Sequence, residues 1–326
     1  MGLYFTIREK LRFNPTVNKS IYLAQSLYRS QFGRLVGDVR RTRRSVVAEP
    51  QGLALCLRFR DEARFLGEWL EYHAAAGIDH FFLYNNFSTD NYPSVIQPWL
   101  DAGRVTLVDW PRVPASPWAE EDCVRRALGR FRWLGFLDAD EFVVIRDGRS
   151  IGEFLDGFPN APGVGLQWRM FGSSMHRKRP DAPVILAYQQ CAARPNMHIK
   201  TFVRPERAAQ CRNSHSWFYC PLGAAVGEHG NRLYGSINLH PTADIAWINH
   251  YYCKSGEDYL EKAARQSTLD RVGIRFPTHR AERLEEELLK NNQISDARAM
   301  EYYRNRCLAL GRAPVLLEDA PQPWTA

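Results

Sequence analysis

The sequence predicts a layered α/β fold, and three observations lead to that class. From residue 50 onward, short apolar runs of strand length alternate with segments whose apolar residues recur at helical spacing. Glycine and proline residues stand at the boundaries between these segments. Hydrophobic residues make up 45% of the chain, which is enough to bury a large core. We therefore expect a globular protein whose strands form a central sheet covered by helices.

Three successive strand–helix units occupy the first half of this region. Residues 52–60 are an apolar run, residues 62–76 have an amphipathic helical pattern, and Gly77 ends that helix. Pro93 begins the second helix, and Gly103 follows its end. The other elements predicted in this half are strands at 78–84, 104–110 and 133–137 and helices at 93–101 and within 118–131.

The second half is less periodic. Ser255 and Asp258 have the spacing of a capping box at the start of a helix. Loops rich in glycine, histidine and asparagine fill residues 205–245, and such loops often carry specificity. The elements predicted in this half are strands at 163–169, 184–190 and 198–204 and helices at 256–266 and within 280–310.

Charge divides the chain into unequal parts. The net charge is +7, and residues 1–49 hold ten basic and three acidic residues, so the rest of the chain is balanced. We predict a basic, partly helical N-terminal arm over residues 1–49, a main domain over residues 50–270 and a C-terminal helical extension over residues 271–326. A balanced main domain disfavours a nucleic-acid groove, so no nucleic-acid partner is expected.

The arm ends in a basic cluster, Arg40–Arg44. Such a cluster could contact anionic lipid, because each basic residue close to a membrane surface adds about 1 kcal/mol of binding free energy. A solvated basic tail is the alternative, since such clusters are common and non-specific. The sequence leaves both interpretations open.

Several features indicate a cytoplasmic protein, with the inner face of the plasma membrane as a second expected location. No run of about 18 apolar residues could span a membrane. The first residues, MGLYFTIREK, lack the apolar stretch of an export signal. The seven cysteines include no C-x-x-C pair, so reduced thiols are expected rather than a zinc ribbon or a disulfide framework.

The sharpest chemical motif is Asp138-Ala-Asp140, which directly follows the predicted strand 133–137. Open α/β sheets bind ligands beyond the carboxyl ends of their strands, and this D-x-D motif brings carboxylate oxygens to that edge. Together with Glu141, the two aspartates lie between apolar runs, where unpaired charges would be costly. The bare spacing is common, but this context favours Mg²⁺ or Mn²⁺ bridging a diphosphate over a solvated turn.

Further motifs accompany the D-x-D motif in a fixed order. They are residues 60–73 (RDEARFLGEWLEYH), 77–90 (GIDHFFLYNNFSTD), 133–142 (WLGFLDADEF), 168–174 (WRMFGSS), 200–205 (KTFVRP) and 249–255 (NHYYCKS). In order and spacing these motifs resemble glycosyltransferase family 92 and its bacterial family-2-like relatives, over about residues 52–265. The resemblance implies a GT-A fold, which is Rossmann-like, with a mixed central sheet and helices on both faces, followed here by C-terminal helices.

The resemblance also implies a nucleotide-sugar donor, with UDP favoured over GDP, a divalent metal and inversion at the anomeric carbon. Asp138 would contact ribose and metal, Asp140 would be a metal ligand, and His250 would complete the metal shell through a neutral imidazole, as a late histidine often does in GT-A enzymes. A lone histidine is otherwise more often structural. Lys254 would neutralise the leaving diphosphate, and Lys200 would also contact the donor.

The turns after the first two predicted strands supply further candidates for donor binding. These candidates are Arg60, Asp61, Glu62, Asn86 and Asp90. A crevice at this edge would hold the nucleoside, with a carboxylate on the ribose hydroxyls. Capping is the alternative interpretation, in which Asp61 caps the following helix and Ser88 or Asp90 caps another turn.

The acceptor side is less well defined. Aromatic rings stack on the apolar faces of sugars, although core packing is the alternative for each ring. The acceptor-binding candidates are Trp168, Phe171 and Trp217. An inverting transfer also needs one general base within hydrogen-bond reach of the acceptor hydroxyl. The candidates for that base are Glu228, Asp244 and His215, and nothing in their spacing selects one.

The sequence therefore predicts a metal-dependent glycosyltransferase in polysaccharide or surface-glycan synthesis, with a glycan or lipid-linked acceptor. Two other classes stay open. One is another metal enzyme that acts on phosphates, such as a nucleotidyltransferase. The other is a non-catalytic carbohydrate-binding or membrane-adaptor protein.

Overall fold

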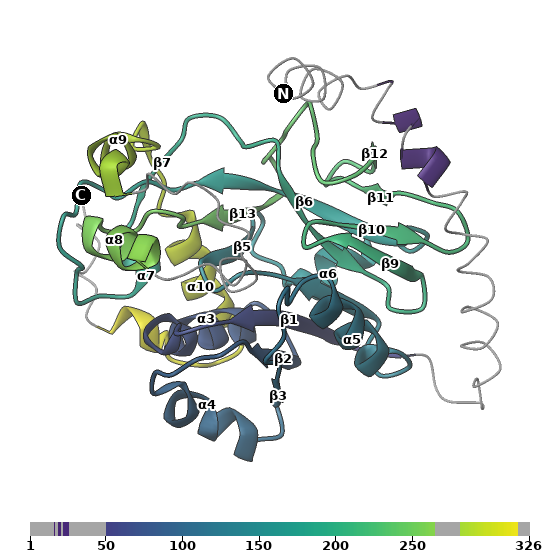
Figure 1. The fold of residues 1–326 in the computed structure, drawn as a ribbon, viewed down its shortest axis with the longest axis horizontal. Coiled ribbons are helices and arrows are strands. Elements are labelled where there is room, and N and C mark those ends of the chain that lie inside the picture. The colour runs from purple at the N-terminus through teal and green to yellow at the C-terminus, as the bar shows by residue number, and fades with distance from the viewer. Residues whose placement is uncertain (1–15, 17–18, 21, 26–49, 265–280, 319–326) are drawn as a thin grey trace.

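The structure is a computed structural model that describes residues 16, 19–20, 22–25, 50–264 and 281–318. A large mixed sheet forms the centre of the molecule, and helices lie on either side of it (Figure 1). The predicted α/β class, with a mixed central sheet and C-terminal helices, is confirmed. Within the described ranges, no helix is both long enough and apolar enough to cross a membrane.

The elements are labelled in chain order. The strands are β1 (Leu53–Phe59), β2 (His80–Asn85), β3 (Val105–Asp109), β4 (Trp133–Phe136), β5 (Glu141–Ile145), β6 (Gly163–Met170), β7 (Gln190–Cys191), β8 (Ile199–Val203), β9 (Ala208–Asn213), β10 (Ser216–Tyr219), β11 (Ala225–Val226), β12 (Arg232–Leu233), β13 (Ala246–His250) and β14 (Ile294–Ser295). The α-helices are α3 (Ala63–Ala75), α4 (Tyr92–Asp101), α5 (Trp118–Ala127), α6 (Ile151–Asp156), α7 (Val184–Ala187), α8 (Gly256–Ala264), α9 (Leu284–Leu289) and α10 (Arg298–Ala309). Short 3₁₀ turns, η2 and η3, occupy Ala281–Arg283 and Val315–Leu317.

The strand order of the large sheet is β12-β11-β6-β8-β4-β1-β2-β3. β1 pairs in parallel with β2 and β4, and β2 pairs in parallel with β3, so the carboxyl ends of these four strands meet at one edge. β8 is antiparallel to both β4 and β6, and β13 is parallel to β6. β13 therefore runs in the direction of β4, and its carboxyl end lies at the same edge of the sheet.

Most predicted elements are found within two residues of their expected bounds, because they rest on apolar runs with clear stops. The predicted capping box is also confirmed: the Ser255 hydroxyl accepts from the Asp258 N–H, and the Asp258 carboxylate accepts from the Ser255 N–H, each at 3.1 Å. The strand predicted at residues 184–190 is wrong, since residues 184–187 form α7. The Glu68 carboxylate accepts from the N–H groups of residues 184 and 185 and so satisfies free donors of that first helical turn.

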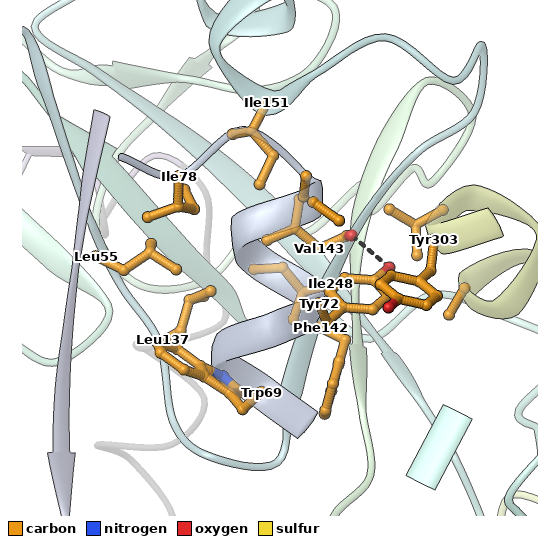
Figure 2. Packing of buried hydrophobic residues seen from close by; sticks show 14 of the residues in the cluster. Leu55, Trp69, Tyr72, Ile78, Leu137, Phe142, Val143, Ile151, Ile248 and Tyr303 are labelled. Atoms are coloured by element: carbon orange, nitrogen blue, oxygen red, sulfur yellow. Dashed lines mark hydrogen bonds between the residues drawn. The ribbon is translucent and has the colours of Figure 1, made fainter. Parts of the chain in front are cut away.

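The larger hydrophobic core lies between the sheet and the helices α3, α6 and α10. Figure 2 shows Trp69 and Tyr72 of α3 in this core beside Phe142 and Val143 of β5. The Tyr72 hydroxyl donates to the Val143 carbonyl at 2.8 Å, and the Trp69 indole donates to the Glu141 carbonyl at 3.1 Å. These two buried bonds fix α3 to β5, which is the strand that follows the D-x-D motif.

A second hydrophobic core covers the opposite face of the sheet, under α5 and the β9–β10 hairpin. Successive side chains of β1 alternate between the two cores, with Ala54 and Cys56 facing α5 and Leu55 and Leu57 facing α3. All seven cysteines are free thiols, as predicted. The same alternation places the side chain of Arg58, the next residue on that face of β1, on the α5 side at the carboxyl edge of the sheet.

Both ends of the described chain pack against this framework. Tyr302 and Tyr303 of α10 lie in the larger core, where their ring centroids are 6.2 and 5.9 Å from that of Tyr72. The described residues of the arm, between positions 16 and 25, are helical, and the buried Tyr22 hydroxyl donates to the Trp217 carbonyl at 3.1 Å. The rest of the arm, including the basic cluster 40–44, lies outside the described residues.

Candidate active site

The D-x-D motif occupies the tight turn between β4 and β5. β5 pairs with β13 in a register that places Glu141 opposite His250. The Tyr251 N–H also donates to the Asp140 carbonyl at 2.8 Å. Strand pairing therefore brings His250 to the motif across more than a hundred residues of sequence.

Asp140 is buried at the centre of this site, between a histidine and a lysine. Its Oδ1 lies 3.5 Å from Nε2 of His250, and its Oδ2 accepts from the Lys262 ammonium at 2.8 Å. Burial alone would raise the pKa of Asp140, but Lys262 and His250 outweigh it and hold that pKa well below its ordinary value. Asp140 is therefore an anion at neutral pH.

Asp138 forms a second charged group with Glu141 and Lys200. The buried Lys200 ammonium donates to Oδ2 of Asp138 at 2.7 Å and lies 3.3 Å from Oε2 of Glu141. Burial would raise the pKa of Asp138, but Lys200 outweighs it and lowers that pKa; burial raises the pKa of Glu141 well above its ordinary value. The Asp138 side chain is 48% exposed, so it faces the solvent while Glu141 lies beneath it.

Lys254 adds a third cation at this edge. It is buried, and its Nζ lies 4.3 Å from the centre of the Phe65 ring, on the first turn of α3. Burial lowers the pKa of Lys254, and the charges of Asp140 and Glu62 oppose that effect. Its backbone has a φ of 52°, a left-handed conformation that costs free energy for a residue other than glycine. The chain thus holds this ammonium close to the carboxylates despite an energetic cost.

The residues at this edge are of the types that bind a divalent metal ion. Asp140 and His250 offer an oxygen and a nitrogen 3.5 Å apart, and Asp138 adds a half-exposed carboxylate two residues away. The second ring nitrogen of His250, Nδ1, is buried with no hydrogen-bond partner among the described residues. Carboxylate oxygens with an imidazole nitrogen suit Mn²⁺, and carboxylate oxygens suit Mg²⁺.

A tighter group of metal-ligating side chains lies elsewhere in the described part of the chain, at Glu228, His229 and Asp244. Both carboxylate oxygens of Glu228 are already engaged, because they accept from the backbone N–H groups of residues 244, 245 and 246. Glu228 therefore anchors the start of β13 and has a structural role that accounts for its burial.

The turns after β1 and β2 are tied to each other. The Asp61 N–H donates to the Ser88 hydroxyl at 3.0 Å, and the Asp61 carboxylate accepts from the Thr89 N–H at 2.7 Å. The Asp90 carboxylate accepts from the Ala63 N–H at 2.7 Å, so Asp90 rather than Asp61 satisfies the first N–H of α3, whose N-cap residue is Glu62. These predicted donor-binding residues form one connected rim at the carboxyl edge of the sheet.

The other donor-side candidates take different positions along that rim. Arg60 lies 3.6 Å from the Asp61 carboxylate. Glu62 is the N-cap residue that precedes α3, and it acts electrostatically on Lys254 and Lys262. Asn86 is buried, and its amide donates to the carbonyl of residue 110, so it holds the loop after β3.

Of the three aromatic acceptor candidates, the structure places only Trp168 beside the motif. Its ring lies 4.3 Å from the His250 ring and is half-buried. Phe171 is fully buried in the larger core against Tyr251, and Trp217 is buried in the second core against Phe136. Neither Phe171 nor Trp217 is therefore available to stack on a sugar, because core packing occupies both rings.

The three candidates for the general base are also separated. Asp244 and Glu228 lie at the start of β13, and six residues at about 3.3 Å each put Asp244 about 20 Å from His250. His215 lies near the site, with its ring 5.1 Å from that of Trp168. Its Nδ1 lies 2.8 Å from the Ile199 carbonyl, which selects the tautomer with a proton on Nδ1 and a free acceptor at Nε2.

Burial lowers the pKa of His215 to about 4, and Lys200 adds to that effect. The imidazole is therefore neutral at physiological pH. Of the candidate bases, His215 alone combines a position beside Trp168 with an unprotonated ring nitrogen, whereas Glu228 and Asp244 lie at the opposite end of β13.

Comparison with known proteins shows the family of this chain. A model of glycosyltransferase family 92 matches residues 52–230. The chain belongs to glycosyltransferase family 92. It is 31% identical over 223 residues to a glycosyltransferase family 92 protein of Ricinus communis, a match that covers 67% of this chain and 38% of that protein. It is 27% identical over 275 residues to another of Oryza sativa subsp. japonica, with 83% and 41% covered.

This family 92 chain thus spans about two fifths of the length of the curated relatives that it matches. Among solved structures it is similar to HddC from Yersinia pseudotuberculosis, with a TM-score of 0.31 and 8% identity over 48% of this chain and 78% of that chain, a likeness too weak to carry an argument. The region that matches the family model contains Asp138, Asp140 and Lys200, whereas His250 and Lys262 follow it.

Sequence reasoning missed three charged residues that the structure places near the D-x-D motif. Lys262 donates to Asp140, and Arg58 and Glu120 line a small hollow together with Asp138 and Lys200. Lys262 and Glu120 lie on amphipathic helices, where such residues are usually solvated, and nothing local distinguished them. Arg58 did carry a signal, because it is the one charged residue within the apolar run of β1. A charge in a buried strand indicates a partner or a ligand.

Proposed function

We propose that this chain is a metal-dependent glycosyltransferase that moves a sugar from a nucleotide-sugar donor to a glycan or lipid-linked acceptor, with inversion at the anomeric carbon. The observation that carries the proposal is the pairing of Asp140 with His250 and Lys262 at the carboxyl edge of the sheet. Open α/β sheets bind ligands at that edge. We place the reaction in polysaccharide or surface-glycan synthesis.

Asp138, Asp140 and His250 would hold Mn²⁺ or Mg²⁺ at this edge. When bound, the ion would neutralise the charge of the donor diphosphate. Lys200, Lys254 and Lys262 supply three further positive charges from β8, the segment after β13, and α8. Preorganised cations around a leaving diphosphate stabilise the charge that develops on it. The buried Lys254 would already be in place, so no free energy would be spent on moving it during the reaction.

The rim formed by Arg60, Asp61 and Asp90 supports the donor side of this proposal, because it connects the ends of β1 and β2 next to Glu62 and Lys254. A UDP-sugar is the donor that we favour. On the acceptor side, Trp168 offers a ring beside His250. His215 would accept the proton of the attacking hydroxyl at Nε2, since its Nδ1 is directed to the Ile199 carbonyl.

The cellular setting is part of the same proposal. A lipid-linked acceptor would be met at the cytoplasmic face of the membrane, where Arg40–Arg44 would contact anionic lipid. Deleting the whole arm would also remove Tyr22, which is packed against the β9–β10 hairpin. A sharper test exchanges the four arginines of the cluster for glutamine and measures binding to vesicles of phosphatidylserine and phosphatidylcholine. Unchanged binding would remove lipid contact from the proposal.

A thermal-shift panel, followed by a donor-hydrolysis assay, tests the function itself. We expect UDP to raise the melting temperature only with Mn²⁺ or Mg²⁺ present, and GDP to do so less. Asp140→Asn should abolish both the shift and hydrolysis of the UDP-sugar, whereas Asp147→Asn, in an exposed pair with Arg149, should leave both unchanged. Stabilisation by nucleoside triphosphates alone, or hydrolysis that survives EDTA and Asp140→Asn, would contradict the proposal.

A further inference from the structure

A small hollow opens at the carboxyl ends of β1 and β4, on the α5 side of the sheet. The hollow is lined by Cys56, Arg58, Glu120, Phe136, Leu137, Asp138, Lys200 and Ser214. Asp138 and Lys200 connect it to the D-x-D motif, where they form an ion pair of 2.7 Å. The hollow is therefore a recess of the candidate active site itself.

Glu120 and Arg58 present unsatisfied polar atoms to this recess. Glu120 is 5% exposed, and its Oε2 has no hydrogen-bond partner within the described residues. The Nε of Arg58 is likewise buried and unpartnered there, and it lies 3.9 Å from Oε1 of Glu120, beyond hydrogen-bond distance. The two groups face each other without closing the bond that would satisfy both.

This arrangement is costly unless an ordered water or a ligand completes it. A buried carboxylate without hydrogen bonds loses the free energy of its hydration, and an ion pair at 3.9 Å returns only part of that loss. Buried polar groups in folded proteins nearly always have partners. The open side of the recess is formed by Arg58, whose side chain is 30% exposed, and by Asp138, which is 48% exposed. A ligand at the edge of the sheet can therefore reach the pair.

We infer that Glu120 and Arg58 bind the nucleoside half of the donor, through two adjacent polar atoms of which one donates a hydrogen bond and the other accepts one. The donating atom would donate a hydrogen bond to Oε2 of Glu120, and the accepting atom would accept one from the Nε–H of Arg58. This inference rests on the nucleotide-sugar donor proposed above. It adds a recognition pair that lies outside the turns already described.

The charges that line the recess indicate which half of the donor it would bind. A buried carboxylate repels a phosphate group, and the two cations of the recess, Arg58 and Lys200, are already paired with Glu120 and Asp138. The diphosphate therefore belongs mainly with Lys254 and Lys262, outside the recess. Two parts of a nucleoside carry adjacent donor and acceptor atoms: the 2′,3′-diol of ribose and the N3–H with its neighbouring carbonyl in uracil. Both are uncharged, and each could present its pair of polar atoms at the mouth of the recess.

The test measures the affinities of UDP and of inorganic pyrophosphate by isothermal titration calorimetry with Mn²⁺. It compares the wild-type protein with Glu120→Gln and with Arg58→Gln. Glu121→Gln is the matched control, since Glu121 is the next residue of α5 and bonds the Cys211 N–H outside the recess. We expect Glu120→Gln to weaken UDP binding by about tenfold to a hundredfold, the range for a hydrogen bond to a charged group, with pyrophosphate affinity unchanged. The Arg58→Gln variant should show a loss in the same direction, and the control should show none.

Two analogues identify the atoms that are bound. If the penalty of Glu120→Gln disappears with the 2′,3′-dideoxy analogue of UDP, the diol is the ligand; if it disappears with CDP, whose N3 lacks a hydrogen, the uracil edge is the ligand. Either result supports the inference. UDP binding that is unchanged in both variants, or an equal loss for pyrophosphate in folded variants, would overturn it. A wild-type protein that binds no nucleotide would instead count against the proposed function.

Discussion

The ammonium of Lys262 lies 2.8 Å from Oδ2 of Asp140, although the two residues are 122 positions apart in the chain. The Lys262 ammonium also lies 4.7 Å from the centre of the Tyr252 ring, which steadies it. A lysine here neutralises the same carboxylate that would bind a divalent cation. The two cations would therefore compete for one carboxylate, with Lys262 at Oδ2 and the metal ion at Oδ1 beside His250.

This competition predicts that Lys262→Met binds Mn²⁺ more tightly than the wild-type protein in the absence of nucleotide. The Lys262 side chain is 37% exposed, so we expect a gain of only about twofold to fivefold, the range for a partly exposed ion pair. Titration of free Mn²⁺ by electron paramagnetic resonance measures it directly. Lys290→Met, which removes an exposed partner of Glu287, is the control. Equal or weaker Mn²⁺ binding by a folded Lys262→Met protein would rule the competition out.

Trp168 and Trp217 should respond to substitution in different ways. Trp168→Ala is expected to raise the KM for an acceptor by about tenfold with a small change in melting temperature, because this ring is half-buried beside His250. Trp217→Ala removes a ring that is buried in the second core, which costs about 3–5 kcal/mol of stability. Initial rates against acceptor concentration, with thermal unfolding of both variants, separate the two effects. A Trp168→Ala variant with normal acceptor KM would show that the ring only packs.

The packing of Tyr22 predicts that the arm contributes to the stability of the main domain. Its hydroxyl donates to the carbonyls of Trp217 and Gly223, and its ring stacks on Phe218 at 5.6 Å between centroids. Tyr22→Phe should cost about 1 kcal/mol, and Tyr22→Ala about 3 kcal/mol, which corresponds to a fall in melting temperature of roughly 6 °C or more. Scanning calorimetry gives both values. Melting temperatures that match the wild type would mean that the helix is not docked in solution.

His73 predicts a fall in stability at mildly acidic pH. Burial lowers its pKa to about 3, from an ordinary value near 6.5, and its Nδ1 lies 2.9 Å from the Trp69 carbonyl. Because the unfolded chain binds the proton more readily, the contribution of His73 is complete above about pH 6.5 and is lost as the pH falls toward 3.

At pH 5.5 this loss amounts to about 1.4 kcal/mol. Urea unfolding at pH 7.5 and pH 5.5 should show it in the wild-type protein, superimposed on the other titrating groups. The difference between the two pH values should shrink by that amount in His73→Gln, whose side chain does not titrate. A variant with the same pH dependence as the wild type would contradict a buried neutral His73.

The sequence predicted the first half of the fold well, because β1, α3 and β2 consist of clear apolar patterns and Gly77 follows the end of α3. It failed at α7, whose first N–H groups are satisfied by Glu68 from 116 residues away. Local patterns cannot reveal a partner at that distance. The short strands β9 to β12 were missed for a related reason, since their pairing rather than their composition defines them.

The candidate site shows the same division. Asp138, Asp140 and His250 were predicted from motifs, and the register of β5 with β13 explains why those motifs lie close together. Lys262 and Glu120 were not predicted, because a charged residue on an amphipathic helix is expected to face the solvent unless a partner is known. Glu228 was a candidate for the general base, but in the structure its carboxylate anchors the start of β13 through three backbone N–H groups. No local sequence pattern indicates that anchoring role.

The pairing of β5 with β13 also sets the order in which this site can be completed during synthesis. The turn that carries Asp138 and Asp140 emerges from the ribosome more than a hundred residues before His250 and Lys262. Until the later strand and α8 arrive, the carboxylates of the motif lack two of their cationic or metal-binding neighbours. Contacts of such long sequence separation form late, because the loop between them must first be closed. A nascent chain can therefore pair most of its sheet before this candidate site is complete, and we expect the site to be among the last parts of the protein to form.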